Sequence, residues 1–528
     1  MFKSSSPFYR HYILTVLIIV YIFNFVDRQI ISILAENIRA DIGINDSQIG
    51  FLYGTAFAVF YAIFGIPLGR LADNWQRRKL ISIGLGFWSL MTALSGTARN
   101  FWTLSAYRIG VGIGEASATP AALSMLSDYY PKSVRATVMG LYSSGIYIGA
   151  GIGLGIGGFV VDNWNQAWPD HSLSPFGLKG WQAAYLSVGL PGILLALLVW
   201  TLKEPIRGAI DGIAPPASNP RPFATALREL AAMLPISNLF VFSHYKAPRH
   251  FYVYHLVGAA LIALLIYTLI AFTGSAAQWL ALGLGCYCTL SWMQINSLSD
   301  PVGFALMFKT RSYLLSIIGF SCIAFVTYGV GFWGPPFFQR VHGMSVADSG
   351  LILGLSAAIG GGVGIILGGI MGDAAKKVHA SGGLYLSALV ASLALPANLI
   401  MLTNSNLTIA LIANFIGLLL APMWIGIATS TVTGLVLPRL RAIASAFYIL
   451  IVTIIGLGLG PYSIGLMSTL MELGGQTAGA ALQYANIYGS FMFLAGAVFL
   501  LIAARYLPAD EASILKRARQ SGENIETS

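Results

Sequence analysis

Apolar runs of about 20 residues or more recur along the chain, and they limit it to one class of fold. A run of that length crosses a lipid bilayer as an α-helix, because a helix rises about 1.5 Å per residue and the hydrocarbon core is about 30 Å thick. Hydrophobic residues make up 56% of the 528 residues and charged residues only 9%, whereas soluble domains carry roughly a quarter charged residues. The sequence therefore predicts an all-α polytopic membrane protein.

We predict fourteen membrane spans, in two sets of six with two additional segments between the sets. The first six lie near 11–37, 48–70, 79–98, 101–127, 136–160 and 181–202. The additional segments lie near 251–272 and 276–297, and the last six near 312–338, 347–371, 383–402, 407–435, 442–470 and 487–506. The predicted domains are an N-terminal six-helix bundle (1–202), a cytoplasmic linker (203–250), a two-helix hairpin (251–311), a C-terminal six-helix bundle (312–507) and a tail (508–528).

The positions of the 30 lysine and arginine residues indicate the orientation. If the N-terminus lies inside, most of them fall on the inner side, and the exceptions are Arg39, Arg99, Lys179 and Arg340 outside and Arg28 and Arg108 within spans. Because Lys and Arg concentrate on the cytoplasmic side of membrane proteins, we predict an inner or plasma membrane protein with both termini in the cytoplasm. The net charge of +10 then follows from topology and does not indicate a nucleic-acid partner.

Three connecting segments lie outside this regular plan. The linker is Pro-rich and becomes amphipathic around 223–234, which fits a helix along the membrane surface and a short soluble helix equally well. The outer loop "DNWNQAWPDHSLSPFGLKGW", over about 161–181, either gates the protein or binds a partner, and no motif decides between the two. The additional hairpin has no function that its sequence predicts.

An internal repeat relates the two halves of the chain. "GINDSQIGFLYGTAFAVFYAIFGIPLGRLADNWQRRK" begins at Gly43, and "GMSVADSGLILGLSAAIGGGVGIILGGIMGDAAKKVH" begins 300 residues later at Gly343. The positions that match at this offset are Gly43, Gly50, Gly54, Gly69, Asp73 and Arg77 with Gly343, Gly350, Gly354, Gly369, Asp373 and Lys377. Two repeated six-span halves are an architecture of transporters, with the substrate site between the halves.

The loop "GRLADNWQRRK" resembles the motif between the second and third spans of the major facilitator superfamily. Asn74 and Gln76 stand where that motif usually has Arg and Gly. The resemblance implies a conformational latch at the inner membrane edge, made by residues of this motif and of its repeat: Gly69, Asp73, Arg77, Arg78, Asp373 and Lys377. "YRIGVGIGEASATPAALSMLSDYYP" is similar to the fourth span of the superfamily, with Arg108 as its membrane-embedded arginine.

Within that superfamily, "NFVDRQIISIL" together with "YRIGVGIGEAS" looks like the Spinster family of lysolipid and sphingolipid transporters, most strongly over roughly 20–160. The resemblance implies a twelve-span core that works by alternating access. It also implies coupling to protons and an amphipathic anionic lipid substrate, such as sphingosine-1-phosphate or a relative. The two segments of the additional hairpin depart from that plan.

Four charged residues lie deep inside predicted spans. Asp27 and Arg28 are in the first span, and Arg108 and Glu115 are in the fourth at comparable depths. Arg108, Gly112, Glu115 and Thr119 are spaced by four, three and four residues, which predicts one shared helix face. Neighbouring residues on a helix point about 100° apart, so we expect Asp27 and Arg28 to contact different partners. Charges within a membrane are costly and usually functional.

These residues predict a polar lining in the N-terminal half. Arg28 and Arg108 would bind an anionic headgroup, since guanidinium suits phosphate and carboxylate, and Asn24 and Thr119 would line the same space. Asp27 and Glu115 are candidate proton carriers, because burial and a neighbouring arginine act on a carboxylate in opposite directions. The alternative is that the charges form static ion pairs that hold the helices together.

The C-terminal half has almost no charge within its spans. Its candidate substrate contacts are aromatic: Tyr328, Trp333, Trp424 and Tyr448. Packing is the alternative role for each. A charged N-terminal wall and an aromatic C-terminal wall suit a ligand with a polar head and a hydrocarbon tail, whereas a sugar would favour polar groups on both.

The fifth span contains seven glycines between Gly145 and Gly158. Small residues allow helices to approach closely. The stretch resembles the antiporter motif of the superfamily but lacks its proline, and tight packing alone is an alternative explanation for it.

Other classes of function find little support. The sequence has no HExxH, G-x-S-x-G or P-loop motif, and its three cysteines suggest no metal site, so we expect no enzyme, no cofactor and a proton gradient as the energy source. The alternative to a lipid carrier is a facilitator or antiporter for a drug, a sugar or an organic anion. We expect a monomer in the lipid bilayer.

Overall fold

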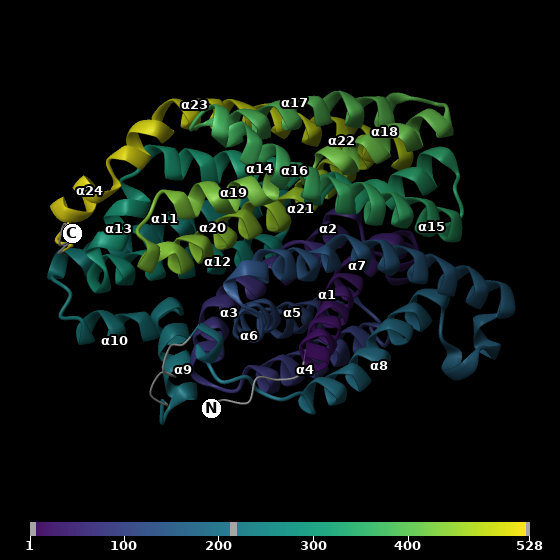
Figure 1. Cartoon of the computed structure of the whole chain (residues 1–528). Helices are drawn as coiled ribbons and strands as arrows, with labels where there is room; N and C mark the ends of the chain where they lie inside the picture. Colours follow the sequence, from purple (N-terminus) through teal and green to yellow (C-terminus); the bar gives the residue numbers. More distant parts are fainter. Residues whose placement is uncertain (1–6, 212–218, 524–528) are drawn as a thin grey trace. The chain divides into compact units, whose positions relative to one another are not determined.

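The computed structural model describes residues 7–211 and 219–523, and every regular element in those ranges is helical (Figure 1). The prediction of an all-α chain is confirmed. The helices form two compact units. We call them the N-terminal unit, Met1–Glu229 with Phe332–Gly362, and the C-terminal unit, Leu230–Gly331 with Val363–Ser528.

The elements of the N-terminal unit are α1 (Pro7–Ile42), α2 (Asp46–Tyr53), α3 (Thr55–Asn74), α4 (Arg77–Ser95), α5 (Phe101–Glu115), α6 (Ala118–Tyr129), α7 (Lys132–Ala167), η1 (His171–Leu173), η2 (Pro175–Gly177), α8 (Gly180–Trp200), η3 (Ala209–Asp211), most of α9 (Pro222–Met233), the end of α14 (Arg311–His342), α15 (Val346–Ser356) and η4 (Ala357–Gly361).

The elements of the C-terminal unit are α10 (Ser237–His244), α11 (Arg249–Thr273), α12 (Ala276–Ser299), α13 (Pro301–Phe308), the start of α14, α16 (Gly362–Val378), α17 (Gly382–Thr403), α18 (Leu407–Leu420), α19 (Trp424–Gly434), η5 (Pro438–Leu440), α20 (Arg441–Val452), η6 (Thr453–Leu459), α21 (Gly460–Leu473), α22 (Ala478–Ser490), α23 (Met492–Ala512) and α24 (Ile514–Gln520).

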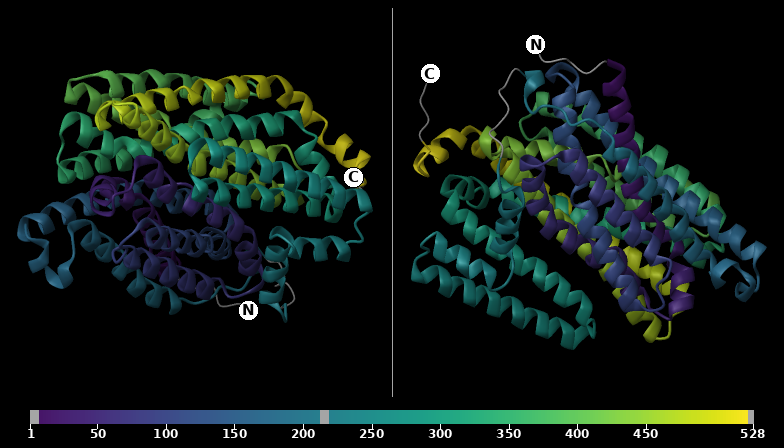
Figure 2. Two further views of the ribbon diagram at one scale, coloured as in Figure 1. Left: turned by 180° about the vertical axis from the view of Figure 1, so that it is seen from behind. Right: turned by 90° about the horizontal axis from the view of Figure 1, so that it is seen from below.

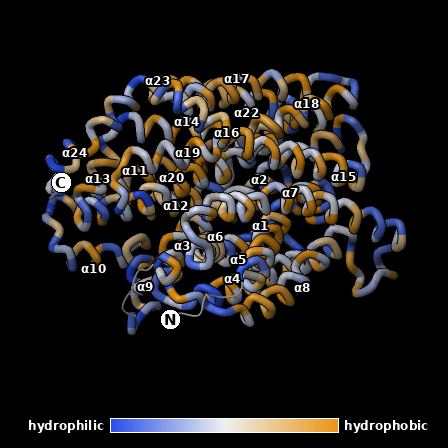
Figure 3. Tube along the Cα trace, viewed as in Figure 1, coloured by the Kyte–Doolittle hydropathy of each residue, from blue (hydrophilic) through white to orange (hydrophobic). Residues whose placement is uncertain are grey.

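The number of spans differs from the prediction. Within the described residues, eleven helical stretches are long and apolar enough to cross a membrane, or twelve if the pair α9 and α10, bent by 105°, counts as one. The predicted fourteen are not confirmed. The helix α4 begins with Arg77, Arg78 and Lys79, and α5 ends after 15 residues. The helix α12 carries buried polar residues such as Gln278 and Asn296. Apolar residues nevertheless dominate most helices, and the loop between α7 and α8 is mostly hydrophilic (Figure 3).

The additional hairpin is present, and it packs on the amphipathic part of the linker. The helices α11 and α12 lie side by side (Figure 2). Asn238 of α10 donates a hydrogen bond to Ser291 of α12 over 2.7 Å, and His255 of α11 lies 2.8 Å from the hydroxyl of Tyr287. Ala232, Phe242 and Ile295 form a small apolar core beside this polar group. The segment predicted to be amphipathic is therefore helical in α9 and continues into a buried junction.

Glycines of α7 set the position of α1. A Cβ atom at Gly149 would lie 2.4 Å from the carbonyl oxygen of Ile22, and one at Gly153 would lie 3.0 Å from that of Val26. The next glycine of this face, Gly157, meets the Ile33 side chain in the same way. Only glycine allows the two backbones to come this close, as in other membrane helix pairs.

A second glycine face of α7 packs on α15. A Cβ atom at Gly151 would lie 2.3 Å from the carbonyl oxygen of Gly354, and one at Gly158 would lie 2.5 Å from that of Val346. The glycines that the sequence places in this span therefore serve close packing on two sides. Gly350 and Gly354 belong to the repeat that matches Gly50 and Gly54, so part of that repeat is also explained by packing.

The end of α14 belongs to the N-terminal unit, whereas the sequence predicts a C-terminal bundle that begins at 312. Ser32 of α1 donates a hydrogen bond to the carbonyl oxygen of Phe332 over 2.5 Å, and the Phe332 ring stacks on Tyr53 with centroids 4.2 Å apart. Arg340 then forms ion pairs with Glu36 of α1 at 2.6 Å and with Asp46 of α2 at 2.7 Å. The Arg340 side chain is 7% exposed and that of Asp46 is fully buried.

We expect Arg340→Gln to lower the free energy of unfolding by about 3 kcal/mol, because removing one partner of a buried ion pair leaves the other charge uncompensated. Thermal unfolding of the purified protein in detergent measures the loss. The matched control is Arg439→Gln, whose side chain is 46% exposed beside Asp300 and Glu523 and should change the unfolding temperature little. Equal effects of the two changes would contradict this account.

We expect Gly149→Ala to lower the unfolding temperature, since the new methyl group meets the backbone of α1. Gly155→Ala is the control from the same helix, because a Cβ atom there has no neighbour within 4 Å. That change should be neutral or stabilise the helix by up to about 1 kcal/mol. The comparison fails if Gly149→Ala is as stable as Gly155→Ala.

Candidate functional site

The centre of the N-terminal unit holds an ion pair between Arg28 of α1 and Glu115 of α5. The Nη2 atom of Arg28 lies 2.8 Å from Oε2 of Glu115. The Arg28 side chain is 8% exposed and that of Glu115 is fully buried. Such a pair is costly to place in an apolar interior, and it is costlier still to break. The structure thus brings together two of the four predicted intramembrane charges.

Aromatic rings surround the Arg28 guanidinium group. Its carbon atom lies 4.4 Å from the ring centre of Phe57, 4.7 Å from that of Phe25 and 5.3 Å from that of Tyr61. A guanidinium group is attracted to the face of an aromatic ring, most strongly where water is excluded. Arg28 is therefore held by the carboxylate of Glu115 and by rings from α1 and α3. The sequence analysis included Glu115 but none of these rings.

Arg108 binds backbone oxygens and not a carboxylate. Its Nη1 atom donates to the carbonyl oxygen of Asp27 over 3.1 Å, and its Nε atom donates to that of Leu52 over 3.3 Å. The guanidinium carbon lies 5.8 Å from the ring of Phe57, which therefore contacts both arginines. Gly112 allows this arrangement, since a Cβ atom there would lie 2.6 Å from the backbone oxygen of Phe57.

Asp27 is fully buried, and neither of its carboxyl oxygens has a hydrogen-bond partner among the described residues. Thr92 and Trp88 of α4 are close enough to influence it, and their side-chain donors are also unpartnered. Arg108 and Glu115 act on it through their charges. An uncompensated carboxylate is expensive in an apolar interior. Asp27 and Arg28 accordingly face different neighbours, as adjacent helical residues should.

Asn24 and Thr119 lie at two sides of this group. The Asn24 Oδ1 atom is 3.5 Å from Nη2 of Arg28, and its Nδ2 atom has no partner among the described residues. Thr119 follows a break at Ala116 and Ser117, where α5 ends and α6 begins. It lies beside the buried Tyr142 and not on one continuous helix with Arg108 and Glu115. The span that the sequence predicts near 101–127 is thus divided into α5 and α6, and Thr119 does not share one unbroken helix with Arg108 and Glu115.

The inner motif is built around Arg77, which is fully buried. Arg77 forms ion pairs with Asp128 at 2.5 Å and with Glu204 at 2.8 Å. Glu204 also accepts a hydrogen bond from the backbone nitrogen of Arg78 over 3.0 Å. Arg207 donates to the carbonyl oxygens of Ala72 and Trp75. These contacts fasten the end of α6 and the linker after α8 to the start of α4.

The other predicted latch residues are less tightly held. Asp73 is exposed and has no ion-pair partner within 4.0 Å among the described residues, although Arg70, Arg207 and Arg77 act on it through their charges. Gly69 has open space where a Cβ atom would lie. In the C-terminal unit, Asp373 and Lys377 are exposed, and the ion pair of that segment joins Lys376 to Glu511 at 3.4 Å.

Three of the four aromatic candidates gather in the C-terminal unit. The rings of Trp424 and Tyr448 pack on Phe320 with centroids 5.7 and 6.4 Å apart. Tyr328 lies near Tyr448. Trp333 does not belong to this group, because it is buried in the N-terminal unit, with Arg340 6.0 Å from its ring centre. The indole nitrogen of Trp424 has no partner among the described residues.

Sequence analysis missed the residues that complete these groups. Asp128 and Glu204 lie at the ends of spans, where charged residues are common. Only their short distances to Arg77 in the folded chain identify them. Phe57 is one of 29 phenylalanines, and no pattern marks it as the ring between two arginines. The glycine at position 112, on the same helix face as Arg108, was the available signal for a close neighbour.

Comparisons with known proteins agree with this arrangement. The sequence model described as "Major Facilitator Superfamily" matches residues 17–461. The "MFS-type efflux pump" of Mycolicibacterium smegmatis is 24% identical over 494 residues, which are 93% of this chain and 92% of that protein. "Protein spinster homolog 1" of Xenopus tropicalis is 24% identical over 523 residues, which are 95% of this chain and 82% of that protein.

A solved structure is also similar. The crystal structure of a bacterial homolog to the human lysosomal transporter Spinster, inward-facing and unoccupied, gives a TM-score of 0.67 at 27% sequence identity. The match covers 97% of this chain and 99% of that one. The predicted resemblance to Spinster proteins is thereby confirmed.

We expect Arg28→Met to lower the free energy of unfolding by about 3 kcal/mol, because Glu115 then stays buried without its counter-charge. The double variant Arg28→Met with Glu115→Gln should recover much of that loss, since the uncompensated charge is removed as well. Thermal unfolding of both variants in detergent measures the difference. A double variant no more stable than Arg28→Met would show that the ion pair does not account for the loss.

Proposed function

The chain belongs to the Major Facilitator Superfamily, and from this premise we propose that it moves an amphipathic anionic lipid across the membrane in exchange for, or together with, protons. Membership confirms the predicted facilitator fold and makes the chain a membrane transporter that works by alternating access, not an enzyme. The class of substrate and the coupled ion are the proposal. A lysolipid or sphingolipid such as sphingosine-1-phosphate is the substrate class that the Spinster resemblance implies.

The contrast between the two units supports an amphipathic substrate. The N-terminal unit buries Asp27, Arg28, Arg108 and Glu115. The aromatic group around Phe320 in the C-terminal unit is uncharged. Arginine binds phosphate and carboxylate well, and aromatic rings offer apolar surface to a hydrocarbon chain. We assign headgroup binding to the arginines and contact with the lipid chain to Tyr328, Trp424 and Tyr448.

The single observation that carries proton coupling is the state of the two acids. Asp27 is buried and accepts no hydrogen bond within 3.5 Å among the described residues, although Thr92 and Trp88 lie nearby, and the second oxygen of Glu115 also accepts none within that distance. Burial of a carboxylate charge without full compensation is costly. A proton on Asp27 or Glu115 removes the charge and this cost, so its binding and release would change the free energy of the buried group. We propose that Asp27 carries the coupled proton.

The second candidate function is export or uptake of a drug, a sugar or an organic anion. The name of the similar protein from Mycolicibacterium smegmatis, an efflux pump, favours this class. An organic anion would use the same arginines as a lipid headgroup. A dependence of transport on the length of the hydrocarbon chain separates the two, because only a lipid substrate gains from a longer apolar tail.

We expect proteoliposomes that contain the protein to take up radiolabelled sphingosine-1-phosphate faster when a pH gradient is imposed, and Asp27→Asn to lose that dependence. The reason is that the asparagine side chain does not bind or release a proton at the pH values of the assay. The control is Asp348→Asn, an exposed residue of α15 whose acceptor oxygen the amide retains. This control should keep both the uptake and its response to the gradient.

Each outcome of this assay has a separate meaning. Wild-type uptake that does not depend on the pH gradient would support the lipid substrate and contradict proton coupling. No uptake by protein shown to be folded and inserted would move the assignment to the drug or organic-anion class. Gradient-dependent uptake that survives in Asp27→Asn would exclude Asp27 as the proton carrier and leave Glu115 to be tested.

A further inference from the structure

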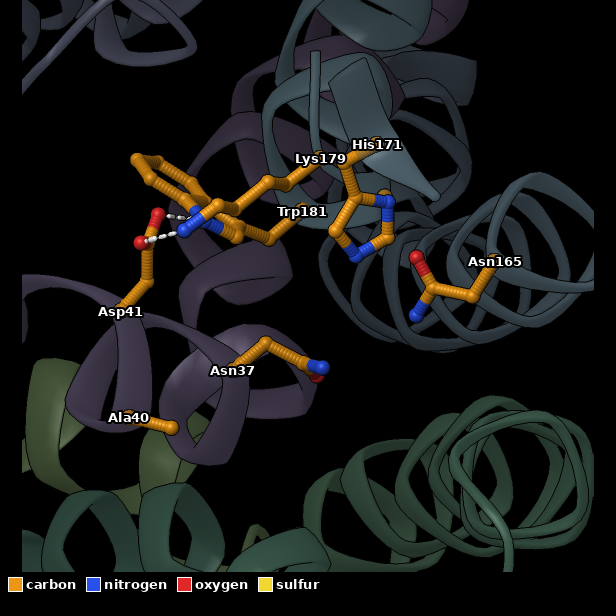
Figure 4. A pocket seen from close by; sticks show the side chains of 8 residues that line it. Asn37, Ala40, Asp41, Asn165, His171, Lys179 and Trp181 are labelled. Atoms are coloured by element: carbon orange, nitrogen blue, oxygen red, sulfur yellow. Dashed lines mark hydrogen bonds and ion pairs between the residues drawn. The ribbon is translucent and has the colours of Figure 1, made fainter. Parts of the chain in front are cut away.

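A cavity of about 220 Å³ lies in the N-terminal unit, apart from the buried charges. It is formed by the C-terminal end of α1, the end of α7, the loop that carries η1 and the start of α8. Figure 4 shows the side chains of Asn37, Asn165 and His171 pointing toward the same space from three of these elements. By the predicted topology this end of the unit lies outside the cytoplasm. The loop is the one whose role the sequence left open.

Three polar atoms around this cavity are buried and unpartnered. They are Oδ1 of Asn37, Oδ1 of Asn165 and Nδ1 of His171, and none has a hydrogen-bond partner among the described residues. A buried polar atom without a partner costs about 1–3 kcal/mol. The side chains that carry these three atoms line one cavity, which indicates a site that a ligand with several hydrogen-bonding groups would complete.

The walls of the cavity are well fixed. Trp164 donates a hydrogen bond to the carbonyl oxygen of Leu178 over 2.7 Å, and the Ser174 hydroxyl lies within hydrogen-bond distance of the carbonyl oxygens of His171 and Leu178. A Cβ atom at Gly180 would lie 2.6 Å from Oδ1 of Asn165, so glycine at the start of α8 leaves room for that amide. The loop therefore has a defined shape, as a binding site requires.

The charges at the site select against an ion. Asp41 accepts hydrogen bonds from the ammonium group of Lys179 and, over 2.8 Å, from the indole nitrogen of Trp181 (Figure 4). Lysine and aspartate thus compensate each other, and the unpartnered groups are two amides and an imidazole, all of which suit hydroxyl groups. Pockets for drug-sized ligands measure about 300–1,000 Å³, so this one fits a smaller molecule.

We propose that this cavity binds a small neutral polyol, either a free sugar or the sugar headgroup of a lipid. The hydroxyl groups donate to Asn37 and Asn165 and exchange a hydrogen bond with His171. The bound polyol joins α1 to α7 and to the loop before α8. This assignment is independent of the substrate proposed above, because none of these residues contacts the Arg28–Glu115 pair.

Binding of free polyol is tested by saturation-transfer NMR of the full chain with myo-inositol and glucose. The protein is held in nanodiscs of phosphatidylcholine, since glycoside detergents carry the same chemistry and would compete. We expect saturation transfer from the protein to at least one of the two polyols. The buffer contains no glycerol, and its other components should show no transfer. Inorganic phosphate, followed by phosphorus NMR line broadening, serves as the anionic comparison and should not bind.

Binding of a lipid headgroup is tested in a second arm. The unfolding temperature is compared in nanodiscs with and without a glycosyl diacylglycerol. A rise caused by this lipid, without transfer to the free sugars, would assign the site to a glycolipid. Transfer to free sugars without that rise would assign it to a free polyol. Neither effect, or binding of phosphate in place of the sugars, would overturn the proposal.

Two variants locate the binding. Asn165→Leu and Asn37→Leu, on different helices, should each weaken polyol binding by up to about tenfold, the loss expected when one ligand hydrogen bond is removed. The matched control is Asn163→Leu, an exposed residue of α7 that bonds to the Phe159 carbonyl oxygen and does not line the cavity. Unfolding temperatures without ligand show that each variant is folded. Equal binding by all three variants would place the polyol elsewhere and overturn the assignment.

Discussion

The close contact between α1 and the glycines of α7 is the constraint on which the N-terminal unit depends. Gly149 and Gly153 let α7 rest on the backbone of α1 near Ile22 and Val26. This contact fixes the rotation of α1 just before Asp27 and Arg28, and therefore decides which way each of those charges points. Arg28 and Glu115 lie on separate helices, so their distance of 2.8 Å depends on the position of α1, which this contact fixes.

The same helix carries three different kinds of interaction along its length. Its middle presents Asp27 and Arg28 to α4 and α5, and its next turns present Ser32 and Glu36 to the end of α14. Its last turns line the cavity with Asn37. From Arg28 to Asn37 is nine residues, or roughly 14 Å along a helix. A substitution at one of these places that shifts or rotates α1 as a rigid helix therefore also moves the residues at the other two.

The sequence predicted the site best where the free-energy cost of burying a charge marks a residue. Intramembrane charge is so expensive that Asp27, Arg28, Arg108 and Glu115 could be singled out from spacing and depth alone. It failed where a contact depends on the folded backbone, as for Phe57 between two arginines or Asp128 beside Arg77. The count of fourteen spans is not confirmed for a related reason. The prediction counts α4, α5 with α6, and α12 as spans because of their apolar runs, whereas α4 begins with three basic residues, α5 ends at Glu115 and α12 carries buried polar residues.

The pairing of Arg28 bears on how the proposed transport would be coupled. Arg28 is held by Glu115 and by three rings, so an anionic headgroup can bind it only by displacing the carboxylate or by sharing the guanidinium group. A proton on Glu115 removes the charge that competes with the headgroup, whereas a proton on Asp27 leaves that competition in place. The two acids therefore have different consequences on this proposal. Protonation of Glu115 favours loading of the substrate, and protonation of Asp27, which faces α4, acts on the packing of α1 against its neighbours. On this proposal Asp27 carries the coupled proton, and the charge of Glu115 sets how readily the headgroup reaches Arg28.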